Sequence, residues 1–231
     1  QLLNLGVKRP INVLPYWVNH QRWRVEGEGL AMLPKSDQMI LGSFQRDTGG
    51  GSLGESKEYK PKLEKGPDIY VEIVKRLGVD KVTPFYPGWR REYIASQLKD
   101  FPDVSEASGK MPSNSMNLLY NAVRHCGGYY LVTSRYEGGP QAVLEAALTR
   151  TKILSTDVGI ASDILHPSCI CGKADAPGTI EAFVDRIKGD TITEDVIEYN
   201  YQSAMRYSMD KVVPLYDAFL KEVFDASLSK P

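Results

Sequence analysis

Ser134-Arg-Tyr-Glu137-Gly-Gly-Pro-Gln-Ala-Val-Leu-Glu145 is the stretch of this chain that decides its fold, because it sets two glutamates around a Gly-Gly-Pro turn. The apolar run 129–133 leads into it as a predicted strand, and the run 141–149 leads out of it as a predicted helix. A strand that turns on glycines into a helix leaves unpaired backbone N–H groups at one point, where the helix dipole adds positive charge. The stretch therefore predicts an anion site at a strand-to-helix turn.

The two glutamates of this stretch are predicted to face one pocket. Glu137 lies on the turn, beside the point where a phosphate would bind, and Glu145 lies further along, inside the helix. Helical side chains lean toward the N-terminus, so Glu145 can reach back toward the same pocket. Because one carboxylate beside a phosphate is unfavourable, two carboxylates indicate a ligand that carries sugar hydroxyls as well as phosphates.

The composition is that of a globular protein of 231 residues, 42% of them hydrophobic and 25% charged. A net charge of −1 gives no bulk attraction to nucleic acid, so no nucleic-acid partner is expected. No apolar run approaches the roughly 18 residues of a membrane span. Three cysteines are too few for a disulfide scaffold and fit a cytoplasmic location. Cys169 and Cys171 are predicted to lie in a short strand, 166–171, rather than to bind a metal.

Strands and helices are expected to alternate along most of the chain. Apolar runs predict strands at 39–44, 82–86, 129–133 and 152–156. Helical spacing predicts helices at 67–77, 91–98, 116–123, 141–149, 179–187 and from 193 onward, and residues 45–64 are expected to form a long loop. This pattern predicts an α/β fold, a Rossmann-like parallel sheet with helices on both faces. Ligands of such sheets bind at the carboxyl ends of the strands.

The stretch from Glu137 to Glu145 resembles the E-x(7)-E motif of the retaining, GT-B type glycosyltransferases of family 4, also called glycosyl transferases group 1. The following run, Ser155 to Asp163, resembles that family's next strand and turn. The resemblance extends over about residues 10 to 225. It implies that the chain is one half of a GT-B architecture, the C-terminal half that binds the donor sugar nucleotide.

The beginning of the chain resembles the family's interdomain segment. Ile11-Asn-Val-Leu-Pro15 and the residues after it are similar to the point where the family's chain leaves the linker and enters the donor domain. The resemblance implies a hinge or linker at residues 1–20 and a donor nucleotide-sugar binding domain at residues 21–231. The N-terminal, acceptor-binding half is then missing, and the isolated chain is expected to be inactive without it.

The resemblance also implies roles for single residues. Arg46 and Lys65 match the Arg and Lys that hold the donor diphosphate in the family, where two fixed cations stabilise the leaving phosphate without a metal. Glu145 is expected to bind the ribose and Glu137, the catalytic residue, to lie by the anomeric carbon. The donor is also expected to contact the turn through its backbone N–H groups, around Gly138, Gly139, Pro140, Gln141 and Ala142.

The resulting hypothesis is a glycosyltransferase that moves a sugar from a UDP- or GDP-sugar, with retention, to a carbohydrate or lipid-linked acceptor. No cofactor and no metal is expected, and a peripheral membrane location stays open for the full protein. One alternative is a fragment that binds a nucleotide sugar without turnover. Another is a GT-B type epimerase or phosphorylase, although neither further acid/base residues nor a pyridoxal lysine can be identified in the sequence.

Overall fold

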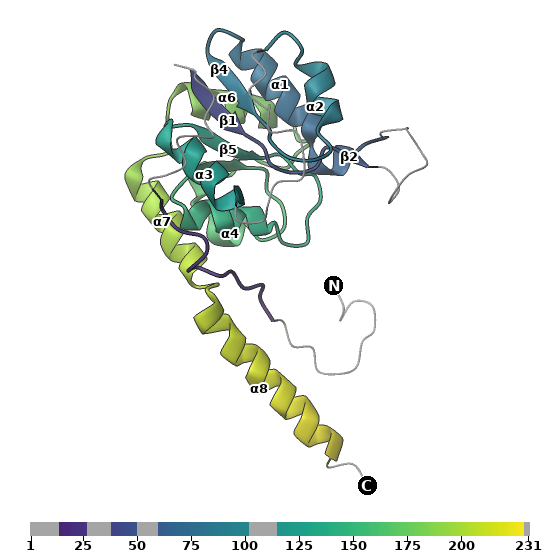
Figure 1. Cartoon of the computed structure of the whole chain (residues 1–231), viewed down its shortest axis with the longest axis vertical. Helices are drawn as coiled ribbons and strands as arrows, with labels where there is room; N and C mark the ends of the chain where they lie inside the picture. The colour runs from purple at the N-terminus through teal and green to yellow at the C-terminus, as the bar shows by residue number, and fades with distance from the viewer. Residues whose placement is uncertain (1–13, 27–37, 50–59, 102–114, 229–231) are drawn as a thin grey trace.

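The computed structural model describes residues 14–26, 38–49, 60–101 and 115–228 (Figure 1). Parts of several sequence predictions lie outside these ranges, namely the predicted linker 1–20, the segment 11–15 and the long loop 45–64.

A four-stranded parallel sheet forms the centre of the fold. Its strands are β1 (Met39–Gly42), β4 (Val82–Phe85), β5 (Tyr129–Val132) and β6 (Lys152–Ser155), in the spatial order β4-β1-β5-β6. All three pairings are parallel, and nearly every strand residue is buried. The strand order reverses between β1 and β5, which is the point where open α/β sheets bind their ligands.

Helices cover both faces of this sheet, as predicted, and Figure 1 shows the sheet between the two layers. One layer contains α1 (Pro67–Leu77), α2 (Glu92–Gln97) and α6 (Thr179–Lys188). The other contains α3 (Ser115–His125), α4 (Gln141–Leu148), the short α5 (Ala161–Ile164) and α7 (Glu194–Met205). The last helix, α8 (Met209–Leu228), extends away from the body of the domain.

The beginning of α1 is fixed against the end of β5 by a glycine. Gly66 has a φ of +64°, and a Cβ atom there would lie 1.8 Å from the carbonyl oxygen of Thr133. The Thr133 hydroxyl donates a hydrogen bond to the Gly66 carbonyl at 2.8 Å, and Pro67 occupies the first turn of the helix. Only glycine allows this approach, and it brings Lys65 to the carboxyl end of the sheet.

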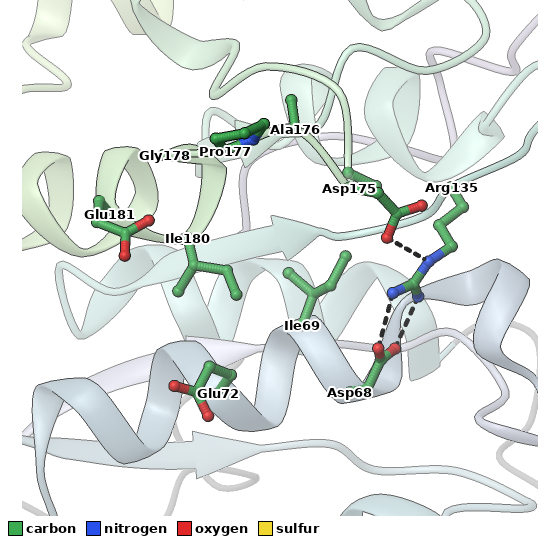
Figure 2. A pocket seen from close by; sticks show the side chains of 11 residues that line it. Asp68, Ile69, Glu72, Arg135, Asp175, Ala176, Pro177, Gly178, Ile180 and Glu181 are labelled. Atoms are coloured by element: carbon green, nitrogen blue, oxygen red, sulfur yellow. Dashed lines mark hydrogen bonds and ion pairs between the residues drawn. The ribbon is translucent and has the colours of Figure 1, made fainter.

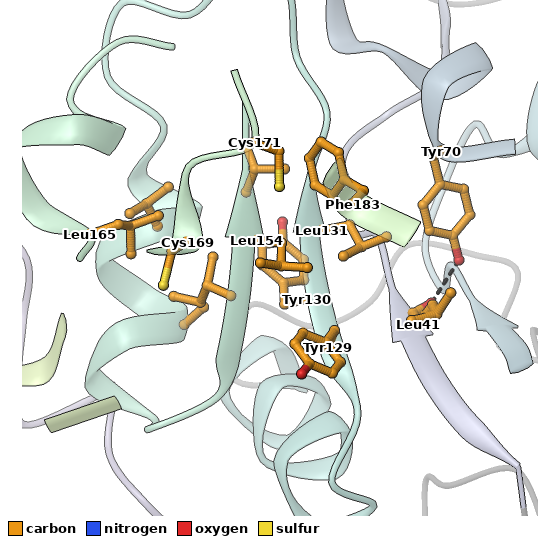
Figure 3. Close-up of a cluster of buried hydrophobic side chains, with 14 of the residues drawn as sticks. Leu41, Tyr70, Tyr129, Tyr130, Leu131, Leu154, Leu165, Cys169, Cys171 and Phe183 are labelled. Atoms are coloured by element: carbon orange, nitrogen blue, oxygen red, sulfur yellow. Dashed lines mark hydrogen bonds between the residues drawn. The ribbon is translucent and has the colours of Figure 1, made fainter. Parts of the chain in front are cut away.

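The core lies on both sides of β5 and β6 (Figure 3). Tyr129, Tyr130 and Leu131 of β5 are fully buried, and Phe183 of α6 is buried as well. The hydroxyl of buried Tyr70 is satisfied by the Leu41 carbonyl, to which it donates at 2.6 Å. The hydroxyl of Tyr129 donates to Asp190 Oδ1 at 2.6 Å, so the polar ends of both Tyr70 and Tyr129 are satisfied.

The strand predicted at 166–171 is wrong. Residues Pro167–Cys169 form a short 3-10 helix, η4, and only Ile170 makes a parallel bridge, to Ser155 at the end of β6. The backbone turns here because Pro167 fixes its own φ and the Nδ1 atom of His166 accepts a hydrogen bond from the Ser168 amide at 3.2 Å. Cys169 and Cys171 are both buried free thiols, and their sulfur atoms accept hydrogen bonds from Asn200 at 3.4 Å and Arg186 at 3.2 Å.

The predicted loop 45–64 contains more regular structure than expected. β2 (Thr48–Gly49) pairs antiparallel with β3 (Lys60–Pro61), and the 3-10 helix η3 (Leu63–Lys65) follows directly. This small ribbon stands at the carboxyl end of β1. Lys65 therefore ends an ordered turn and does not lie on an open loop.

Residues before β1 lie against the C-terminal helices. Val18 makes a parallel bridge to Ser208, and the hydroxyl of Tyr216 in α8 donates to the Pro15 carbonyl at 3.0 Å. The predicted division into residues 1–20 and 21–231 stays a prediction. Among the described residues, no helix combines the length and apolar character needed to cross a bilayer.

Candidate functional site

Lys65 and Glu137 form an ion pair at the carboxyl end of the sheet. Lys65 Nζ lies 2.6 Å from Glu137 Oε1, and the two side chains are 30% and 14% exposed. The Gly66–Thr133 contact sets the Lys65 segment against β5. The amide of Arg135, two residues before Glu137, donates to the Glu64 carbonyl at 2.9 Å. The structure thus brings two of the predicted site residues into direct contact.

Two uncharged side chains complete the surroundings of the Glu137 carboxylate. The buried Ser134 hydroxyl lies 3.2 Å from Glu137 Oε1 and 2.8 Å from Gln45 Oε1. Gln45 Nε2 lies 3.5 Å from the same Glu137 oxygen. Sequence reasoning missed Gln45 and gave Ser134 no role. Their positions in the sequence were the only signal that could have found them. Gln45 directly precedes Arg46 after the first strand, and Ser134 begins the stretch 134–145.

The turn after β5 presents unpaired backbone donors, as predicted. Pro140 is the N-cap of α4 and gives no side-chain capping bond. Among the residues that the structure describes, no acceptor meets the amides of Gly138, Gly139, Gln141 or Ala142. These donors and the helix dipole make the turn a favourable place for an anion.

The ring of Tyr16 lies over this turn. A Cβ atom at Gly139 would come within 2.3 Å of the ring, so a larger residue at that position would displace the Tyr16 side chain. Tyr16 also lines a cavity of about 410 Å³ together with Gln141 and Glu145. The remaining walls come from the segment before β1 and from α8, namely Trp17, Val18, Asn19, Arg22, Trp23 and Tyr216.

Glu145 is half-buried and lines that cavity. The hydroxyl of Tyr120 in α3 donates to Glu145 Oε2 at 3.1 Å. Burial raises the pKa of the Glu145 carboxyl to about 7, against the opposing effects of the Tyr120 hydrogen bond and the charge of Arg22. A carboxyl in this state can exchange its proton for hydrogen bonds from ligand hydroxyls near neutral pH. Glu145 does not contact Lys65 or Glu137.

Arg46 lies apart from the Lys65–Glu137 pair. Its exposed guanidinium stacks on Trp89, with 5.0 Å between Cζ and the ring centroid, and Arg90 stacks on the same ring at 4.4 Å. Within the described ranges, Arg46 makes no hydrogen bond or ion pair with Lys65 or Glu137. The predicted cationic pair is therefore on one rim of the sheet but not in contact.

Two buried charges support the loop that carries Arg46. The Asp47 carboxylate accepts hydrogen bonds from the amides of Ile94 at 3.0 Å and Tyr93 at 3.4 Å, and so caps α2. Burial raises the pKa of Asp47. Burial also lowers the pKa of Arg91 to about 10, although the nearby charge of Asp47 acts against this shift. Neither residue was singled out from the sequence as part of the site.

No metal cluster stands out in the described part of the chain. None of the His, Cys, Asp and Glu side chains described here gather in groups of three or more that could hold an ion. The expectation that the donor binds without a metal stays a prediction.

Solved structures share this arrangement of sheet and helices over more than nine-tenths of the chain. Sucrose-phosphate synthase from Thermosynechococcus elongatus matches with a TM-score of 0.70 at 14% identity, covering 93% of this chain and 53% of that one. A glycosyltransferase from Rickettsia africae matches with a TM-score of 0.70 at 16% identity, covering 93% of this chain and 57% of that one. The fold is that of one half of a GT-B glycosyltransferase.

A further match is a structure that contains a nucleotide sugar. Anabaena HepE in complex with UDP-glucose matches with a TM-score of 0.68 at 15% identity, covering 91% of this chain and 57% of that one. The chain thus spans a little over half the length of these glycosyltransferases. No protein-family model and no curated protein matches the sequence. At these identities the likeness establishes the fold.

Proposed function

We propose that this chain is the donor-binding half of a retaining glycosyltransferase of family 4. The observation that carries the proposal is the Lys65–Glu137 pair beside the unpaired amides at the beginning of α4. A cation, a carboxylate and several backbone donors at one point suit a ligand with a diphosphate joined to a sugar. The UDP-glucose complex of the similar HepE structure supports the same ligand class.

In this mechanism the donor diphosphate lies across the amides of Gly138 to Ala142. Lys65 then serves two anions, the Glu137 carboxylate and the phosphate, and it neutralises charge that grows on the leaving phosphate as the glycosidic bond breaks. Glu137 lies next to the transferred sugar and stabilises positive charge near the anomeric carbon. Arg46 reaches the diphosphate by leaving Trp89, because its side chain is exposed and long.

The ribose of the donor is assigned to Glu145. The carboxyl lines the same cavity as Gln141, which is the first residue of α4, so phosphates at the helix start and a ribose in the cavity are adjacent. An ionised Glu145 can accept hydrogen bonds from two neighbouring hydroxyls. Because Lys65, Arg46 and the helix start supply the positive charge, binding is proposed to need no metal, and EDTA should leave the affinity for UDP unchanged.

A second candidate function is binding of a nucleotide sugar without turnover. The observation that favours it is that the chain spans a little over half of the similar glycosyltransferases, whose length allows a second half. In this case the purified chain binds nucleotides, and release of nucleoside diphosphate from a sugar nucleotide is absent. Addition of a carbohydrate or lipid-linked acceptor does not change that result.

The test is a thermal-shift and calorimetric screen of the 231-residue chain with UDP, GDP and ADP and their glucose or mannose conjugates. Ligand at one hundred times its Kd stabilises the native state by about 2.7 kcal/mol. We expect binding of one nucleotide family, and Lys65→Ala should weaken it by roughly 1.5–3 kcal/mol. Lys75→Ala is the matched control, since Lys75 is exposed at the other end of α1. Equal affinities in the two variants would remove Lys65 from the site.

A further inference from the structure

Arg135, inside the stretch 134–145, is held by two other segments of the chain, and Figure 2 shows its contacts with Asp68 and Asp175. Its Nη1 and Nη2 atoms lie 2.8 and 2.7 Å from the two carboxylate oxygens of Asp68, in the first turn of α1. Its Nε atom lies 2.8 Å from Asp175 Oδ1, in the loop before α6. Nη1 also donates to the Leu63 carbonyl at 2.7 Å. A planar guanidinium that uses all three nitrogens in this way has one orientation.

These contacts span both partners of the Lys65–Glu137 pair. Arg135 precedes Glu137 by two residues, and Leu63, whose carbonyl it holds, precedes Lys65 by two residues. The backbone repeats the connection, because the Arg135 amide donates to the Glu64 carbonyl at 2.9 Å. Asp68 lies three residues after Lys65. The side chain therefore fixes the Lys65 segment on both sides, relative to the turn that carries Glu137.

Two open cavities lie beside this connection. A cavity of about 520 Å³ opens between α1 and α6, and another of about 490 Å³ opens beside Tyr136 and Lys173. Arg135 and Asp175 line both of them. The contacts of Arg135 cross this region, whereas the Gly66–Thr133 contact and the packing of α1 on α6 hold the same segments elsewhere.

Arg76 provides a comparison within the same layer. It also bridges two carboxylates, with Nε 2.7 Å from Glu72 and Nη1 in contact with Glu181. It joins α1 to α6 and touches neither segment of the pair, and its side chain is 41% exposed against 19% for Arg135. Exposed ion pairs of this kind contribute little to stability.

We propose that Arg135 is a positioning residue that sets Lys65 against Glu137. The inference rests on the proposed function for the chemical role of the pair, but not for the geometry. Without the guanidinium, the backbone bond from the Arg135 amide to the Glu64 carbonyl remains, but the Leu63 carbonyl and Asp68 lose their donor and the Lys65–Glu137 contact loosens. The donor then meets a Lys65 ammonium group and a Glu137 carboxylate that are no longer correctly placed relative to each other.

The test measures how fast Lys65 reacts with acetic anhydride, by peptide mass spectrometry of the 231-residue chain without nucleotide. An ammonium group held against a carboxylate is protected from acetylation. Loss of such an ion pair should raise the acetylation rate about fivefold. We expect Arg135→Ala to raise the Lys65 rate about fivefold relative to Lys75 in the same sample, and Arg76→Ala to leave it unchanged. Arg135→Lys keeps the positive charge but loses the two-pronged contact with Asp68. Its Lys65 acetylation rate should lie between those of the two alanine variants.

Asp68→Asn is the second variant, used where Arg135→Ala does not fold, and it should act in the same direction. A Lys65 rate that stays at the parental value in every Arg135 and Asp68 variant overturns the proposal. Calorimetry with UDP, GDP and ADP on the same samples tests the function separately. If the parent binds none of these nucleotides, the proposed function fails, and the Lys65 rates still decide whether Arg135 positions the pair.

Discussion

Lys65 Nζ and Glu137 Oε1 lie 2.6 Å apart, although 72 positions separate the two residues in the chain. In the free protein, the charge of Lys65, which is proposed to bind the diphosphate, is neutralised by Glu137, the proposed catalytic residue. An incoming diphosphate must therefore share the Lys65 ammonium group with the Glu137 carboxylate. Removing one or the other charge is expected to change the diphosphate affinity in opposite directions.

Glu137→Gln should tighten the binding of UDP, whereas Lys65→Ala weakens it. The amide keeps the size of the side chain, removes a negative charge beside the phosphates, and releases Lys65 to the ligand. A change of about 1 kcal/mol, close to fivefold in Kd, is expected for one such charge near a solvated surface. Isothermal calorimetry measures it, with Glu72→Gln on α1 as the control. Weaker binding of UDP by Glu137→Gln would show that Glu137 itself contacts the nucleotide.

The same substitution should slow turnover. If Glu137 stabilises charge near the anomeric carbon, its contribution is larger in the transition state than in the ground state. In an enzyme that joins this chain to an acceptor-binding half, we expect Glu137→Gln to lose about two orders of magnitude in rate. Release of nucleoside diphosphate measures turnover, and thermal unfolding checks that the midpoint stays within a few degrees. Parental turnover in this variant would leave Glu137 with a structural role only.

The sequence was sufficient for most of the fold because its signals are local. Gly66-Pro67 begins α1 and Gly78 ends it, and the helix has the predicted bounds Pro67–Leu77. The four buried strands coincide with the four apolar runs to within two residues. Parallel pairing follows from the alternation of strands and helices, which forces crossover connections.

The parts that could not be predicted depend on contacts between distant segments. The Lys65–Glu137 pair requires Gly66 to lie against the end of β5, and no local pattern encodes that approach. The predicted strand 166–171 had apolar character, but Pro167 and the His166 side chain turn the backbone there. Arg46 was matched to Lys65 by resemblance, whereas its neighbour in the fold is Trp89 from the loop after β4.

Glu145 should make the stability of the fold depend on pH near neutrality. Its pKa is raised from 4.5 to about 7, so the folded chain holds a proton that the unfolded chain releases between these values. The protonated Glu145 carboxyl makes its full contribution to the free energy of unfolding below pH 4.5. That contribution is lost as the pH rises through 7, and the free energy of unfolding then falls by about 3 kcal/mol at most. Solvent in the cavity beside the carboxyl reduces that amount.

The variant that isolates this effect is Glu145→Gln. At pH 5 the parental carboxyl is protonated and resembles the amide, so urea unfolding should give similar free energies for the two proteins. At pH 8 the variant should be more stable than the parent by about 1–3 kcal/mol, because it has no buried charge to desolvate. A difference that is the same at both pH values would mean that Glu145 does not titrate in this range.

Gly66→Ala should be strongly destabilising, and Gly178→Ala provides its matched control. Both glycines are N-cap residues, of α1 and α6, and both are left-handed, with φ of +64° and +85°. A Cβ at Gly66 would lie 1.8 Å from the Thr133 carbonyl oxygen, whereas a Cβ at Gly178 meets nothing within 4 Å. Backbone strain alone costs about 1–2 kcal/mol, so Gly178→Ala should lose that amount. Gly66→Ala must also push α1 from β5 and should lose about 3 kcal/mol or more. Urea unfolding measures both, and equal losses would show that the Thr133 contact yields without cost.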